Sequence, residues 1–301
     1  MAPADRTPDV PPALRPGHPL AGLGYSEPTR RRSLTQLADG TRTEGEAVVA
    51  EEVPVALAYN DRPYAVMMAT PADLEDFAVG FTLTEEIVSS AGVIDRLDVT
   101  RHAQGVEVSL AIPEADAARL ADRHRALIGR VGCGLCGVET IQDAMREPRA
   151  LPAGPTIPVA ALWRAERELP PLQVLNRETG SLHAAAWADA SGAVGLVRED
   201  VGRHNALDKL LGALVRGGLD PAEGFVVVTS RASYELVQKA AVLGVRVLAA
   251  VSRPTGLAIR LAEASGLTLI ALLRGRTANV YAHGERLADA AGAATPTERP
   301  S

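Results

Sequence analysis

Apolar and polar positions in the first half of the chain change their spacing several times, and each change marks a new element. Between residues 46 and 69 they alternate, which predicts the two strands of a hairpin. Thr70-Pro71-Ala72-Asp73 then supplies a hydroxyl, a proline and an acid ahead of apolar residues at helical spacing, which predicts a helix capped by Thr70. A hairpin over 97–112 and a helix over 115–128 complete a half that reads as α+β.

The second half alternates short apolar runs with helical patterns. From residue 224 onward the order is strand, helix, strand, helix, strand, which is typical of an α/β fold with a parallel core. The expected helices cover 159–169, 203–215, 233–243 and 255–264. The expected strands cover 182–188, 194–198, 225–229, 245–251, 267–273 and 278–282.

Proline-rich stretches divide the chain. Frequent prolines near the start deny it regular structure, and a second group between 148 and 158 marks a linker. The expected organisation is a disordered tail over 1–44, a smaller α+β part over 45–130, a cysteine loop with a short helix and linker over 131–158, an α/β domain over 159–288, and a disordered tail over 289–301.

Composition narrows the class of protein. A chain that is 47% hydrophobic and 23% charged can bury a globular core. Its net charge of -6 disfavours nucleic-acid binding by bulk electrostatics, so any anion site must be built locally. No apolar run is long enough to span a membrane, and the N-terminus lacks the apolar centre of a secretory signal. We therefore expect a cytoplasmic protein.

The chain has two cysteines, and both lie in the segment Gly132-Cys133-Gly134-Leu135-Cys136-Gly137. The glycines favour an open loop, and Arg130 together with a following helix N-terminus favours the reactive thiolate form. Such a pair suits attack on a sulfur donor, with one cysteine holding a persulfide and the other aiding its release.

Other chemistries of a Cys-x-x-Cys pair fit less well. A structural zinc site needs four ligands, and no further cysteine is present, so we expect no metal site. A zinc deaminase also needs His-x-Glu, which the chain lacks. Dithiol–disulfide exchange remains open, although such motifs usually begin a helix directly after a strand, whereas a helix precedes this loop.

Two turns share one pattern that suits phosphate. Ser230-Arg231-Ala232-Ser233 and Ser252-Arg253-Pro254-Thr255 each follow a predicted strand and precede a predicted helix. Hydroxyls, an arginine and free backbone N–H groups converge at such a junction. Simple helix capping by Ser233 and Thr255 is the alternative. The repetition of the pattern favours a phosphate-bearing ligand.

Three further stretches are candidates for the same ligand. Arg203 and His204 open a predicted helix with dense polar chemistry, and a solvated helix start is the alternative. His183 begins an apolar strand, and for a lone histidine in such a place a core residue with satisfied hydrogen bonds is the more common interpretation. Asn279, Tyr281 and His283 alternate as one face of an edge strand.

Several segments together resemble the FdhD family. They are residues 70–80, the glycine-framed cysteine loop, residues 199–209 (EDVGRHNALDK) and residues 231–239 (RASYELVQK), and the resemblance covers roughly 45–288. It implies an accessory sulfurtransferase needed for active formate dehydrogenase, with a cytidine-deaminase-like α/β/α larger domain that lacks the deaminase zinc.

The resemblance also implies a route for sulfur. A cysteine desulfurase supplies it as a persulfide on Cys133, with Cys136 as partner. The acceptor is the molybdenum or tungsten bis-molybdopterin guanine dinucleotide cofactor, before it enters the catalytic subunit of formate dehydrogenase. Family members are homodimers. The cofactor-contacting segment falls on Ala278, Asn279, Val280, Tyr281, Ala282 and His283. A cofactor chaperone without obligatory thiol chemistry, and a dithiol oxidoreductase, are the alternatives.

Overall fold

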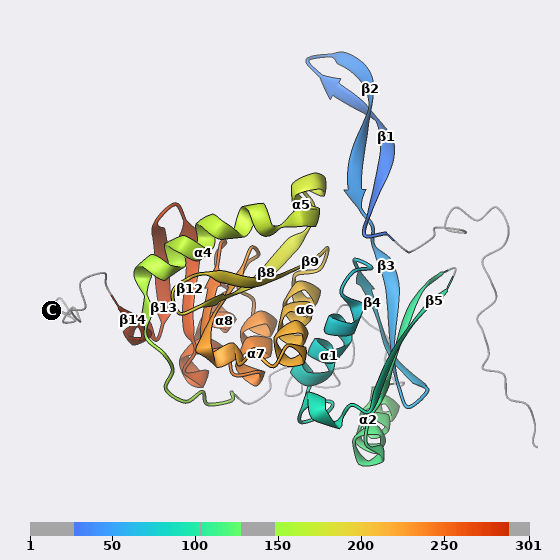
Figure 1. Ribbon diagram of the computed structural model, residues 1–301, viewed down its shortest axis with the longest axis vertical. Helices are drawn as coiled ribbons and strands as arrows, with labels where there is room; N and C mark the ends of the chain where they lie inside the picture. Colours follow the sequence, from blue (N-terminus) through green and yellow to red (C-terminus); the bar gives the residue numbers. More distant parts are fainter. Residues whose placement is uncertain (1–26, 103, 128–147, 289–301) are drawn as a thin grey trace, which may run out of the picture.

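The larger part of the chain is built on one six-stranded sheet (Figure 1). The computed structural model describes residues 27–102, 104–127 and 148–288. The order across the sheet is β13 (Thr277–Ala282), β12 (Thr268–Arg274), β11 (Val247–Ala250), β10 (Gly224–Val228), β8 (His183–Asp189) and β9 (Val194–Asp200). The parallel core expected from residue 224 onward is confirmed, because β10, β11 and β12 run in one direction. The other three strands are antiparallel to their neighbours.

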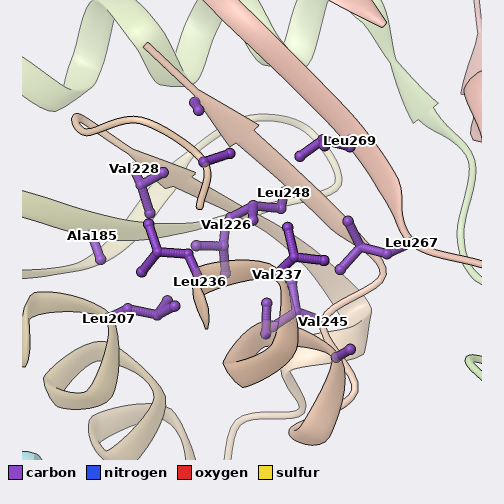
Figure 2. Packing of buried hydrophobic residues seen from close by; sticks show 14 of the residues in the cluster. Ala185, Leu207, Val226, Val228, Leu236, Val237, Val245, Leu248, Leu267 and Leu269 are labelled. Atoms are coloured by element: carbon purple, nitrogen blue, oxygen red, sulfur yellow. The ribbon is translucent and has the colours of Figure 1, made fainter. Parts of the chain in front are cut away.

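Helices cover both faces of this sheet and make it the middle of three layers (Figure 1). Successive residues of β10 point to opposite faces, so Val226 and Val228 pack toward α6, α7 and α8 (Figure 2). Phe225 and Val227 pack toward α4. The helix bounds are α4 Val159–Leu172, α5 Val174–Thr179, α6 Arg203–Arg216, α7 Tyr234–Val242 and α8 Gly256–Ser265. The expected α/β class and α/β/α layering are confirmed.

The smaller part is a four-stranded sheet with its own core. Its order is β4 (Arg62–Ala69), β3 (Val53–Tyr59), β6 (Gly105–Ala111) and β5 (Arg96–His102). α1 (Leu74–Thr84), the short turn η1 (Ala91–Val93) and α2 (Glu114–Leu127) complete it. Phe77 and Phe81 of α1 pack into the apolar cluster of this sheet. Both hairpins expected here are confirmed.

An antiparallel ribbon precedes the smaller part. It consists of β1 (Thr29–Ala38) and β2 (Thr41–Ala50), and it projects from the body of the molecule (Figure 1). The expected disordered tail over 1–44 is therefore wrong for residues 29–44, while residues 1–26 lie outside the described part. Asp39 and Gly40 both have positive φ, the geometry of a two-residue hairpin turn. The Asp-Gly signal outweighed the proline-rich context.

The larger part also contains several short elements. β7 (Ile157–Pro158) pairs in parallel with β14 (Leu287–Ala288), and η2 (Pro221–Glu223) and η3 (Gly284–Arg286) are single turns. Among residues 27–102, 104–127 and 148–288, no helix has both the length and the apolar character needed to cross a membrane.

The two parts meet where α1 lies against α6 (Figure 1). Asp76 of α1 ion-pairs with Arg198, 2.7 Å away, and with Arg216. Thr70 does not cap α1 as expected, because α1 begins only at Leu74 after an Asp73 N-cap in the left-handed region. Thr70 is instead buried and bonded to the larger part, which places the start of α1 next to the end of β9.

Candidate functional site

The strand directions bring most of the candidate segments to one edge of the large sheet. β9, β10 and β11 end at this edge, while the antiparallel strands β8 and β13 begin there. His183 starts β8, Arg203 and His204 follow β9, and Ala278 and Asn279 lie near the start of β13. Ligands of open α/β sheets bind at this edge, beyond the carboxyl ends of parallel strands.

The two Ser-Arg turns lie side by side. Ala232 and Pro254 form a parallel bridge, and the backbone N–H of Thr255 donates to the carbonyl of Ala232 at 3.0 Å. The side chains of Arg231 and Arg253 are both exposed at this junction. The structure thus joins two separate sequence motifs into one surface that can carry two positive charges and two helix N-termini.

The hydroxyls of the two turns have different roles. Thr255 caps α8, since its Oγ1 accepts from the backbone N–H of Ala258 at 3.3 Å. Ser230 is buried and donates to the carbonyl of Arg231, its own neighbour. Ser233 precedes α7 but makes no capping bond, and its buried Oγ has no hydrogen-bond partner among the described residues. Simple capping therefore accounts for Thr255 but not for Ser233.

The loop between β9 and α6 is held by a buried carboxylate. Asp200 accepts from the backbone N–H groups of Gly202 (2.7 Å) and Thr70 (2.9 Å) and lies 2.6 Å from Lys209 Nζ. Both Asp200 and Lys209 are fully buried. The fixed loop sets the position of Arg203, whose buried Nε has no hydrogen-bond partner among the described residues.

Charged and titratable groups surround this loop. His204 Nε2 lies 2.5 Å from Glu235 Oε2 on α7, and this contact lowers the pKa of Glu235 below its ordinary value. Burial, reinforced by the positive charge of Arg203, lowers the pKa of His183. His183 is thus mainly neutral near pH 7, whereas the Glu235 carboxyl is ionised.

The residues of β13 predicted to contact the cofactor do not gather at one edge of the sheet, because the strand runs from one edge to the other. Asn279 is exposed opposite Ala271, and Ala278 packs toward the α4 side. Val280 is 48% exposed, Tyr281 packs against the α8 side, and Ala282 is buried.

His283 is at the opposite edge from the Ser-Arg turns. Its Nε2 lies 2.9 Å from the carbonyl of Glu263, and its Nδ1 lies 3.1 Å from Glu285. The structure does not bring His283 to the two turns, because a strand that begins at their edge must end at the far edge.

Cys133 and Cys136 lie outside the described residues, so their predicted role stays a prediction. Within the described ranges, no cluster of three or more His, Cys, Asp or Glu side chains is arranged to hold a metal ion.

Sequence reasoning passed over three residues that shape this site. They are Asp200, Lys209 and Glu235. A signal existed in the spacing: His204 and Asp208, like Glu235 and Lys239, are four residues apart and so share a helix face. What the sequence lacked was the evidence that these two faces meet.

Comparison with known proteins adds to this geometry. The family model described as "FdhD/NarQ family" matches residues 50–288. The match takes in both sheets and every candidate residue, including the two cysteines.

Curated relatives carry a common name. A Bordetella petrii protein named "Sulfur carrier protein FdhD" is 50% identical over 248 residues, which is 82% of this chain and 89% of that relative. A Cupriavidus necator protein of the same name is 48% identical over 271 residues, 90% of this chain and 94% of that relative.

A solved structure shares the fold. It is the crystal structure of a candidate formate dehydrogenase accessory protein from Desulfotalea psychrophila, with 27% sequence identity and a TM-score of 0.67. The similarity covers 86% of this chain and 99% of that one.

Proposed function

The chain belongs to the FdhD/NarQ family, and we propose that it is a sulfur carrier that serves the maturation of formate dehydrogenase. The observation that carries this proposal is the high identity, over most of both chains, to relatives named as sulfur carriers. The more specific role is that of a sulfurtransferase, with Cys133 as persulfide carrier and Cys136 as its partner. Both cysteines lie within the matched residues.

The loading step is a thiol exchange on sulfur. The Cys133 thiolate attacks the outer sulfur of a persulfide on a cysteine desulfurase, a new S–S bond forms at Cys133, and the desulfurase cysteine leaves as its thiolate. The sulfane sulfur moves without any external oxidant. A low-pKa, exposed thiol is suited to this step, and the glycine framing of Cys133 favours such exposure.

Release uses the second cysteine. The Cys136 thiolate attacks the inner sulfur of the Cys133 persulfide, which forms a Cys133–Cys136 disulfide and expels the outer sulfur as hydrosulfide. The two cysteines supply the two electrons that reduce the sulfane sulfur, and a cellular dithiol then reduces the disulfide. A three-residue step between the two sulfurs fits a bond of this kind.

The acceptor in this proposal is the molybdenum or tungsten bis-molybdopterin guanine dinucleotide cofactor, bound as substrate. Its diphosphate groups suit the paired Ser-Arg turns, where Arg231 and Arg253 are exposed. The buried Ser233 Oγ and Arg203 Nε gain a partner if a phosphate binds there, which removes the cost of leaving them unpaired. His183, His204 and the start of β13 flank the same edge.

The setting follows from this chemistry. The sulfur donor is a cysteine desulfurase, and the catalytic subunit of formate dehydrogenase receives the cofactor. The cytoplasm is the compartment in which the thiols stay reduced. The family resemblance supports a homodimer as the working form.

Complementation tests the thiol chemistry. A strain that lacks this protein should regain formate dehydrogenase activity with the wild type, lose nearly all of it with Cys133→Ala, and lose much of it with Cys136→Ala. Full activity with both variants would instead identify a cofactor chaperone that does not need its thiols. Catalytic reduction of a model disulfide, without cyanide-labile sulfur on the loop, would identify a dithiol oxidoreductase.

A further inference from the structure

The ribbon of β1 and β2 is a regular structure without a core of its own. Its two strands of 10 residues each are paired along their whole length, yet none of these residues is buried. Residues 31–46, which include the turn, are all exposed, and the ribbon projects from the body of the molecule (Figure 1). An isolated two-stranded hairpin is marginally stable at best in water, so this ribbon gains stability when another surface covers one of its faces.

The two faces of the ribbon differ in chemistry. Residues directly opposite each other in an antiparallel pair share a face. Leu34 thus lies beside Gly45 on one face, where a methyl group added to the glycine would be 3.8 Å from the leucine Cδ1. This face, called the Leu34 face below, has no acidic residue. The opposite face carries Leu37 and both acidic residues of the two strands, Glu44 and Glu46.

The Leu34 face is complementary to a second copy of itself. When two ribbons stack with their strands antiparallel about a two-fold axis at Leu34, each Leu34 lies against its symmetry mate. The same stacking places Arg32 of one copy opposite Gln36 of the other, so charges of like sign do not meet. Arg30 at the base of this face is paired with Glu51 of its own chain at 2.8 Å. The opposite face is not self-complementary, because the corresponding stack brings Glu46 against its symmetry mate.

We propose that the Leu34 face is a docking surface for a second copy of this chain, with the two ribbons stacked antiparallel across a two-fold axis at Leu34. The homodimer of the proposed function needs such a surface, and the inference rests on that function to this extent. The family match begins at residue 50, so this surface lies ahead of the matched residues. A contact along strands about 33 Å long is smaller than the interface of a permanent dimer, and we expect a measurable equilibrium between monomer and dimer.

Sedimentation equilibrium of the full chain over a range of concentrations measures this association. Leu34→Glu should weaken the dimer by roughly tenfold or more, because two leucines lose their apolar contact and two carboxylates meet at the axis. Leu37→Glu is the matched control, since it makes the same change in the same strand but on the opposite face. Leu37 is also the more exposed of the two, at 68% against 38% for Leu34, and its substitution should leave the association unchanged.

A second substitution should strengthen the dimer, an effect that a loss of folding cannot imitate. Gln36→Glu places a carboxylate opposite Arg32 of the other copy, and the two-fold axis makes this contact twice. Dimerisation should become roughly threefold tighter at low salt, and this gain should disappear at high salt. Gln36→Lys should instead weaken the dimer, since two cations then face each other. If Leu34→Glu does not fold, these two variants decide the question.

The outcomes separate this surface from the proposed function. A dimer equally strong in wild type and Leu34→Glu would overturn the Leu34 face alone and leave the homodimer in place. Equal weakening by Leu34→Glu and Leu37→Glu would also overturn it, in favour of pairing along the strand edges, where neither face is preferred. A wild type that stays monomeric at every concentration would overturn the surface and the homodimer together. The sulfur gained by Cys133 is measured separately, by the mass of the protein, so its loss in an otherwise dimeric protein would contradict only the proposed function.

Discussion

Gly80 of α1 and Gly212 of α6 face each other at the junction of the two parts. A methyl group on Gly80 would lie 1.8 Å from the carbonyl oxygen of Asp208, and one on Gly212 would lie 1.9 Å from that of Asp76. The obstacles are backbone atoms, which cannot rotate away as a side chain does. The two glycines allow α1 and α6 to approach closely, and this contact positions the smaller part against the edge of the larger sheet that carries the candidate site.

Gly212→Ala should therefore destabilise the protein by at least about 3 kcal/mol, the upper end of ordinary overpacking, or prevent folding. Urea unfolding followed by circular dichroism measures this. Gly256→Ala is the control, because its new methyl group would meet nothing closer than 3.7 Å, the Arg260 guanidinium. Equal stability of the two variants would show that α1 and α6 are not in close contact.

The buried pair of Asp200 and Lys209 should be sensitive to loss of either member. Lys209→Met leaves a buried carboxylate unpaired, so we expect a loss of about 3–5 kcal/mol in the free energy of unfolding. The partly exposed pair of Arg164 and Glu168 is the control, and Arg164→Met should give no resolvable change. A Lys209→Met protein as stable as the control would mean that Asp200 is not held as described.

The sequence predicted the elements of this fold better than their contacts. The positions of β10, β11 and β12, and their parallel arrangement, followed from short apolar runs separated by helical patterns. Thr70 was misassigned because its local pattern matches a helix cap, whereas its real partner, Asp200, is 130 residues away. The ribbon of β1 and β2 was missed because none of its residues is buried, so hydrophobic alternation is weak there.

In the candidate site, too, the sequence predicted the individual segments better than the contacts between them. The two Ser-Arg turns were recognised individually, but their adjacency depends on the register between Ala232 and Pro254. His283 was grouped with the cofactor contacts because it shares a segment with Asn279. The strand carries the two residues to opposite edges, which sequence proximity does not reveal.

His183 should give the stability a measurable pH dependence. Burial lowers its pKa in the folded state below the ordinary value of 6.5, so the unfolded chain binds the proton more readily. Its contribution is complete above pH 6.5 and is lost as pH falls through the lower, folded-state pKa. His183→Gln should flatten the pH dependence of unfolding free energy below pH 6.5. An unchanged slope in that range would mean that this histidine is not desolvated.

The paired turns should act as one anion site. Arg231→Ala and Arg253→Ala should each weaken guanosine diphosphate binding by roughly tenfold or more, since charge-assisted hydrogen bonds contribute about 1.5–3 kcal/mol. Raising the salt concentration should reduce the affinity of wild type more than that of either variant. Arg167→Ala is the control, because this exposed arginine lies on α4, across the sheet. Binding unaffected by both substitutions would exclude the turns as the phosphate site.

The proposed persulfide on Cys133 is tested most directly by the intact mass of the protein after incubation with a cysteine desulfurase and cysteine. The chain has two cysteines, so Cys133→Ala and Cys136→Ala resolve the site completely. Wild type and Cys136→Ala should each gain the mass of one sulfur atom, removable by cyanide, and Cys133→Ala should gain none. A Cys133→Ala protein that gains as much sulfur as wild type, or a wild type that gains none, would contradict the proposal.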